Sequence, residues 1–212
     1  MLDFDKDCKI FKVKNNFSID KIISCNSSIF ESYEVEYLND SVIEISFSWI
    51  DHLKFQDKII SREKKNVVII YMRFLNLIFC FGNTESSILF AIKKIERVAE
   101  FEGEEVNIFE YLKKQFLINN NDFMELISVS FLKEPSVVDK NEIMNIDIVD
   151  INDTEFKEII TNKEITSFLF YSEENACYFF IDNSSVLCFD DNAKKKDVVN
   201  ILFYVARYVN AS

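Results

Sequence analysis

Two short motifs in this sequence carry side chains that could do acid–base or metal-dependent chemistry. Asp51-His52 holds the only histidine, and an aspartate beside a histidine can serve proton transfer. Its position after Trp49 in a polar stretch favours a plain loop residue. Residues 155–157 have the Glu-x-Lys order of metal-dependent nucleases, but a chain with 24 Lys and Arg and 36 Asp and Glu forms such triplets by chance.

The N-terminus resembles the start of a calcium-binding loop, with Asp3, Asp5 and Asp7 at alternate positions. The pattern fails because Cys8 stands where glycine is required and Lys14 stands where a glutamate should bind. No Cys-x-x-Cys spacing suggests a zinc site. We therefore predict no metal, no cofactor and no enzymatic activity.

The five cysteines predict reduced thiols in an intracellular compartment, either nucleus or cytoplasm. Cys80, Cys177 and Cys188 lie inside apolar runs, where cysteine behaves as a small hydrophobic residue. The N-terminus is too acidic for a signal peptide. No run of about 18 apolar residues occurs, so the sequence predicts no contact with a membrane.

Composition predicts a folded, acidic protein. Of the 212 residues, 49% are hydrophobic, with 22 Phe and 8 Tyr, which is enough to build a core. The net charge of −12 argues against a general nucleic-acid coat, because such binding depends on displacing phosphate counterions. Acidity also suits a basic protein partner.

The first half reads as a series of strands followed by a helix. Alternating or apolar runs predict strands over 9–14, 33–37, 41–49, 67–74 and 77–81. The polar stretch 51–66 is most simply an insertion loop. Thr84 is a predicted N-cap, and the helix after it has an apolar stripe of Ile88, Ala91, Ile92, Ile95, Val98 and Ala99.

The second half repeats this order. Residues 67–99 and 176–209 both run strand, turn, strand and helix, and the apolar stripes of the two helices can be superposed. Ile88 then matches Val198, Ile92 matches Leu202 and Ile95 matches Val205. We predict an α+β fold of two similar halves, 1–100 and 123–212, joined by an acidic connection over 101–122.

Three stretches of the sequence are similar to the TATA-box-binding protein family. Residues 29–36, IFESYEVE, resemble the family's Phe-Ser-Ser-Tyr-Glu-Pro-Glu segment. Residues 176–191 are similar to its strand, Ser-Gly turn, strand and Thr-Gly-Ala-Lys stretch, with 182–183 at the turn. Residues 77–98 resemble the same region of the other repeat, with Phe-Gly at 81–82 in place of Thr-Gly.

This resemblance implies a saddle of two pseudo-symmetric repeats, in which antiparallel strands form a curved sheet with helices on its convex face. It also implies that the concave face contacts the DNA minor groove, where aromatic side chains wedge between base steps. The corresponding wedge positions here are Phe30, Tyr71, Phe156 and Phe180. The chain would then be a transcription initiation factor or subunit that binds A·T-rich double-stranded DNA together with other transcription-factor or basic protein subunits.

A second hypothesis is an acidic protein-interaction module, either an inhibitor or a complex subunit, that keeps the fold without binding DNA. The groove-reading asparagines of the family are absent from 9–14 and 124–132, and the chain is acidic. A nuclease using residues 155–157 is the third hypothesis.

If one sheet face is open, alternate aromatic residues of the strands will form an exposed apolar surface there.

Overall fold

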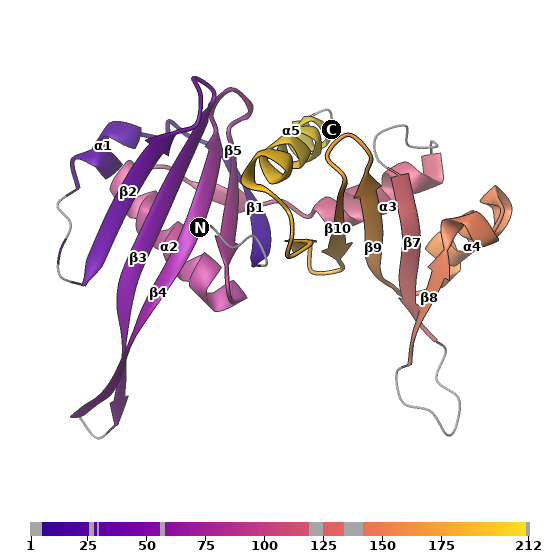
Figure 1. Ribbon diagram of the computed structural model, residues 1–212, viewed down its shortest axis with the longest axis horizontal. Helices are drawn as coiled ribbons and strands as arrows, with labels where there is room; N and C mark the ends of the chain where they lie inside the picture. Colours follow the sequence, from indigo (N-terminus) through magenta and orange to yellow (C-terminus); the bar gives the residue numbers. More distant parts are fainter. Residues whose placement is uncertain are drawn as a thin grey trace. The chain divides into compact units, whose positions relative to one another are not determined.

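The chain forms two units, each built on antiparallel strands with helices (Figure 1). A computed structural model describes residues 6–25, 28, 30–55, 58–118, 125–133 and 142–210, with only the backbone described over 52–62. The first unit spans Lys6–Val106, and the second begins at Asn107. The boundary between them falls inside the predicted connection 101–122.

The first unit is a sheet of six strands in the order β2-β3-β4-β5-β1-β6, and all of its neighbouring pairs are antiparallel. Every strand predicted from the first half is present. The elements are β1 (Asp7–Val13), α1 (Ile19–Ile23), β2 (Glu31–Tyr37), β3 (Val42–Phe55), β4 (Lys58–Met72), a 3₁₀ turn η1 (Arg73–Leu75), β5 (Leu77–Gly82), α2 (Glu85–Ala99) and β6 (Gly103–Glu105).

The stretch 51–66, predicted as an insertion loop, is instead the continuation of a β-hairpin. β3 and β4 stay paired as far as Phe55 and Lys58, whereas β2 and β5 pair only with their other ends. Asp51 and Lys65 form an ion pair across the hairpin at 3.1 Å. The sequence of this part of the hairpin lacks the apolar alternation that identifies a strand, so the pattern predicts a loop.

Helix α2 covers one face of this sheet. The Thr84 hydroxyl caps it as predicted, by accepting a hydrogen bond from the Ser87 backbone N–H at 3.2 Å. Gly82 ends β5 where the chain approaches the helix closely, since a Cβ there would lie 2.9 Å from the Ile88 side chain. The predicted stripe is buried apart from Val98, which is half-buried: Ile88, Ala91, Ile92, Ile95 and Ala99.

Both faces of this sheet carry buried apolar side chains. Residues that face α2 include Ile45, Phe47, Ile69 and Cys80, which belong to one hydrophobic cluster. The residues that alternate with them on β4 and β5 lie on the opposite face and are equally buried: Val68, Ile70, Met72, Leu77, Phe79 and Phe81.

The second unit orders its strands β11-β10-β9-β7-β8, with antiparallel pairing throughout. Its elements are α3 (Ile108–Ile118), β7 (Glu125–Leu132), β8 (Ile143–Asp147), a 3₁₀ turn η2 (Ile148–Asp150), α4 (Asp153–Asn162), β9 (Ile165–Ser172), β10 (Cys177–Asp182), β11 (Leu187–Phe189) and α5 (Lys195–Asn210). The predicted stripe of α5 is buried: Val198, Ile201, Leu202, Val205 and Val209.

A continuous set of aromatic rings forms the core of the second unit. Phe168 of β9 packs against Phe109 and Phe116 of α3, each with its ring centroid 5.0 Å away. Phe179 of β10 stacks on Phe170 of β9 at 5.1 Å. These contacts identify the face of β9 and β10 that packs against α3, so the alternate residues of both strands point to the other face.

The structure does not confirm the predicted pseudo-symmetric repeats. In the first unit the first strand, β1, pairs with β5, which directly precedes the helix. In the second unit the first strand, β7, pairs with β8 and β9 and not with β11. The superposable helices α2 and α5 reflect a local strand–strand–helix order that both units share.

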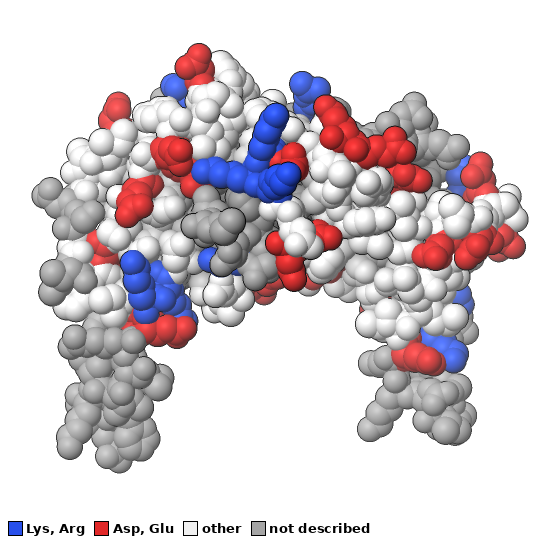
Figure 2. All heavy atoms as spheres, in the orientation of Figure 1, with Lys and Arg blue, Asp and Glu red and all other residues white. Residues whose placement is uncertain are grey.

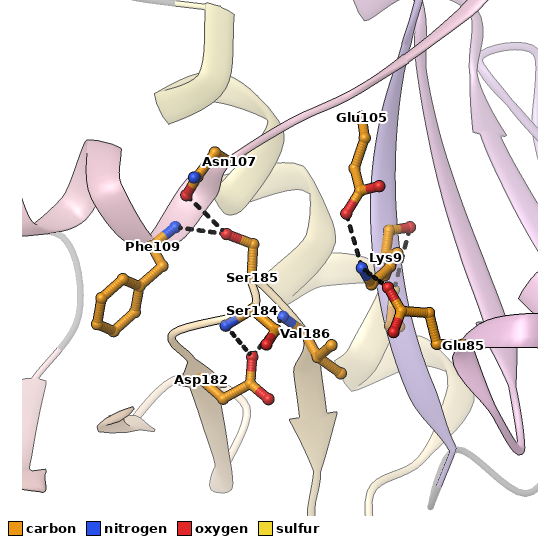
Figure 3. A network of polar contacts seen from close by, with 10 residues as sticks. Lys9, Glu85, Glu105, Asn107, Phe109, Asp182, Ser184, Ser185 and Val186 are labelled. Atoms are coloured by element: carbon orange, nitrogen blue, oxygen red, sulfur yellow. Dashed lines mark hydrogen bonds and ion pairs between the residues drawn. The ribbon is translucent and has the colours of Figure 1, made fainter. Parts of the chain in front are cut away.

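Lys9 holds three elements of the first unit together (Figure 3). It lies on β1 and is only 3% exposed. Its Nζ donates to Glu85 Oε1 of α2 at 2.5 Å and to Glu105 Oε1 of β6 at 2.7 Å. Burial alone would lower the pKa of Lys9, but the hydrogen bonds and charges of Glu105 and Glu85 outweigh it and raise that pKa above 10.5.

We expect Lys9→Met to lower the free energy of unfolding by about 2 kcal/mol, since it removes charge-assisted hydrogen bonds from partly exposed carboxylates. The contribution of Lys9 is present below the unfolded-state pKa and is lost as pH rises through the higher folded-state pKa. The difference in free energy of unfolding between the wild type and Lys9→Met should therefore be constant near neutrality and become smaller at alkaline pH. Urea unfolding of both proteins at several pH values measures this difference. Lys12→Met, an exposed lysine on the same strand, is the control and should change stability by less than about 0.5 kcal/mol.

Candidate functional site

Strand β10 alternates between buried and exposed large side chains. Cys177, Phe179 and Ile181 are at most 4% exposed, whereas Tyr178 is 46% exposed and Phe180 is 40% exposed. The pleat explains this difference, because successive residues of a strand point to opposite faces of the sheet. Two large aromatic rings on adjacent outward positions are the main exposed apolar feature of this strand.

The strand register extends this feature across three strands. Tyr178 lies opposite Tyr171 of β9, with ring centroids 4.6 Å apart, and Phe180 lies opposite Leu169 on one side and Cys188 of β11 on the other. Leu169, Tyr171 and Cys188 are half-buried. We refer to Leu169, Tyr171, Tyr178, Phe180 and Cys188 as the aromatic patch.

The charges around the aromatic patch are acidic. Among the described residues, strands β7 to β11 contain no Lys and no Arg. In Figure 2 the surface over β9 and β10 is white, and the red of Asp and Glu gathers around the turn between these strands. The acidic residues next to the patch in sequence or register are Glu125, Glu173, Glu174, Asp182 and Asp190.

The turn after β10 is fixed by side-chain hydrogen bonds (Figure 3). Asp182 Oδ1 accepts from the backbone N–H groups of Ser184 and Val186, both at 2.9 Å. Ser185 has a left-handed backbone, with φ of 60°, and its hydroxyl accepts from Phe109 N–H at the start of α3 at 3.2 Å. These bonds tie the end of β10 to α3, so Phe180 is presented from a positioned strand.

The four predicted wedge residues lie in different environments. Phe180 belongs to the aromatic patch, and Phe30, which directly precedes β2 in the other unit, is 44% exposed. Tyr71 is not a surface residue: it is 7% exposed, stacks on Phe17 with ring centroids 4.2 Å apart and belongs to the cluster under α2. The pleat of β4 turns it toward α2.

Phe156 also departs from its predicted position on an open sheet. It lies on α4, is half-buried and meets Phe116 of α3 edge-on, with ring centroids 5.8 Å apart. Tyr171 and Tyr178 were not singled out from the sequence. The alternation within CYFFID predicts that Tyr178 points to the same face as Phe180. The sequence does not place Tyr171 beside Tyr178, because this contact depends on the register between β9 and β10.

The residues that the sequence suggested for catalysis or metal binding either have a structural role or lie outside the described part of the chain. Glu155 completes a capping box at the start of α4, where its carboxylate accepts from the Asn152 N–H at 3.0 Å. The His52 side chain, Asp3 and Asp5 are outside the described residues. Among those described, no group of three His, Cys, Asp or Glu side chains could hold a metal ion.

None of the five cysteines, all of which the structure describes, forms a disulfide bond. Burial raises the pKa of the Cys80 thiol well above its ordinary value, and burial together with the charge of Asp190 raises that of Cys177. A raised pKa keeps both sulfurs in the weakly reactive thiol form. Over the part of the chain that the structure describes, no helix is long and apolar enough to cross a membrane.

Comparisons with known proteins identify no family. No protein-family model matches the chain, and no curated protein matches it. Among solved structures, the chain is similar to the TBP of Methanococcus jannaschii at 10% sequence identity, with a TM-score of 0.28, over 98% of this chain and 97% of that chain. A TM-score of this size assigns neither a fold nor a function.

Substitution of the two adjacent phenylalanines of β10, Phe179 and Phe180, should distinguish a core residue from a surface residue. We expect Phe179→Ala to lower the free energy of unfolding by about 3–5 kcal/mol, because it empties a buried site between Phe170 and Phe189. Phe180→Ala removes a partly exposed ring and should cost less than about 1.5 kcal/mol. Chemical denaturation of both variants measures the difference, and equal losses would place Phe180 in the core.

Proposed function

We propose that this chain is a non-catalytic binding protein whose aromatic patch receives a protein segment carrying basic and apolar side chains. The observation that carries this proposal is an exposed pair of rings, Tyr178 and Phe180, on strands that contain no cation. Tyr and Phe are enriched at protein interfaces, because they bury large apolar areas at a low cost in side-chain entropy.

The local charge favours a protein segment over duplex DNA. Affinity for a duplex comes mainly from Lys and Arg that neutralise phosphates, and the described strands of the second unit supply neither. Glu125, Glu173 and Glu174 would instead attract Lys or Arg side chains at the margin of the patch. The rings would then bury apolar side chains at the centre while carboxylates fix the orientation of the segment.

A second candidate function is binding of A·T-rich DNA as a transcription initiation factor or subunit. The observation that favours it is the exposure of Phe30 and Phe180, two of the four positions predicted as wedges. Unstacking one base step costs only a few kcal/mol, which an inserted ring can offset. This function would require cations from a basic protein subunit, since the strands beside Phe180 provide none.

The protein-segment proposal predicts what a random peptide library will yield. We expect peptides selected on the wild-type chain to combine Lys or Arg with aromatic or aliphatic residues, and to lose at least about tenfold in affinity for Phe180→Ser. Fluorescence anisotropy with the selected peptides measures this loss. Phe74→Ser is the matched control, because Phe74 is 80% exposed but belongs to the other unit. Enrichment of acidic peptides, or equal binding to Phe180→Ser, would contradict the proposal.

The DNA candidate predicts binding of an A·T-rich duplex at low salt that weakens as salt increases, because phosphate contacts release counterions. Phe30→Ala and Phe180→Ala should each reduce it, whereas Tyr71→Phe should not, since Tyr71 is buried. Electrophoretic mobility shift assays with and without a basic partner protein test this. No shift under either condition would eliminate the DNA candidate and leave the protein-segment proposal standing.

A further inference from the structure

Strand β8 ends the sheet of the second unit. Among the described residues it pairs with β7 on one side, and none pairs with its other edge. Ile143 is 61% exposed and Met144 is 39% exposed. Edge strands commonly carry a lysine, a proline or a bulge that prevents pairing with another strand. The sequence Ile143–Asp147 has none of these, and its only charge is the aspartate at its end.

The hydrogen bonds of β7 show which backbone groups of β8 point outward. Lys133 N–H donates to the Glu142 carbonyl at 2.9 Å, so the backbone N–H and C=O groups of Glu142 point toward β7. In an antiparallel pair the direction of these groups alternates along the strand, so the backbone groups of Met144 and Ile146 also point toward β7. Leu132 N–H, which donates to Glu164 at the start of β9, confirms the alternation. The N–H and C=O groups of residues 143, 145 and 147 therefore point away from the sheet, and within the described part of the chain they form no backbone hydrogen bond.

The edge strand of the first unit, β2, is protected in the usual way. It places Glu34 and Glu36 at exposed positions, and Glu31 forms an ion pair with Lys94 of α2 at 2.5 Å. Charged side chains along an edge oppose the approach of a second strand. The contrast shows that β8 lacks a device that this same chain uses elsewhere.

We propose that β8 pairs with β8 of a second copy of this chain, antiparallel and centred on Asn145. In this register the outward residues meet one another, with Asn145 opposite Asn145 of the partner copy and Ile143 opposite its Asp147. About six backbone hydrogen bonds can form. Met144 comes opposite Ile146 on the face that packs toward the helices, so an apolar pair forms on each side of the two-fold axis.

Charge selects this register. The antiparallel arrangement sets Asp147 against an apolar residue and separates the two Asp147 residues by four positions along the strand, or about 13 Å. That distance exceeds the Debye length of about 8 Å at physiological ionic strength, so their repulsion is largely screened. A parallel in-register pair would place the two aspartates side by side.

The size of the contact predicts a weak dimer. A five-residue edge buries far less than the roughly 1,200 Å² of a standard interface, so the dimer should form reversibly and no tighter than micromolar. The net charge of −12 on each copy adds long-range repulsion. Dimerisation should therefore strengthen as salt is added, unlike the binding of a basic segment to the aromatic patch. This inference does not rest on the proposed function.

Sedimentation velocity of the full chain, from micromolar to millimolar concentration, tests the proposal with a pair of charge variants. Ile143→Asp places a carboxylate opposite Asp147 of the partner copy and should weaken dimerisation by about fivefold. Ile143→Lys places a cation there and should strengthen it by a similar factor. Ile143 is exposed, so neither variant should unfold the chain, and circular dichroism checks this.

Asn145→Pro removes an outward N–H and keeps the backbone bonds between β8 and β7, and should abolish the dimer. It also loses the hydrogen bond that Asn145 Oδ1 accepts from the Ser130 hydroxyl of β7 at 3.4 Å. Asn145→Ala keeps that N–H and is its control, with dimerisation close to wild type. A wild-type chain that stays monomeric at millimolar concentration would overturn the proposal. So would a dimer that survives Asn145→Pro, or one that responds to Ile143→Asp and Ile143→Lys in the same direction.

Discussion

The pleat of β10 is the constraint on which the candidate surface depends. Phe179 must face α3 to complete the aromatic core with Phe170 and Phe189, and a strand cannot bury one residue without turning its neighbours outward. Tyr178 and Phe180 are exposed for this reason. Burial of Phe179 therefore specifies both the register of β10 and the direction of the two rings available to a partner.

The two units use charge in opposite ways. The first unit places Lys9 inside its sheet and neutralises it with carboxylates from a helix and from another strand, so a cation connects elements that are distant in sequence. The described strands of the second unit contain no Lys or Arg, and apolar contacts stabilise them. Carboxylates are left at the ends of the strands and in turns, where water solvates them. An acidic margin around an apolar centre follows from this distribution.

Sequence periodicity predicted the strands of the first unit and the stripes of α2 and α5, because burial on one face leaves a clear pattern. It failed for 51–66, where the β3–β4 hairpin continues without an apolar alternation in its sequence. It also failed for Tyr71 and Phe156, although both are aromatic residues of the kind that can act as a wedge. Tyr71 is buried because α2 covers its face of the sheet, and Phe156 lies on α4, a helix, and not on a strand. The pairing of β7 with β9 could not be predicted, because strand order depends on contacts between distant residues that a local pattern does not encode.

The pairing of β1 with β5 has a consequence for synthesis of the protein. Asp7 lies opposite Gly82, and Lys12 lies opposite Leu77. During synthesis β1 therefore cannot pair with β5 until about seventy further residues have been added to the chain. β6 then pairs with the same strand, so the first unit is complete only once residue 105 has left the ribosome. Until β5 has been made, the apolar residues of β1 have no strand to pair with, and a chaperone that binds nascent chains would find its target in β1.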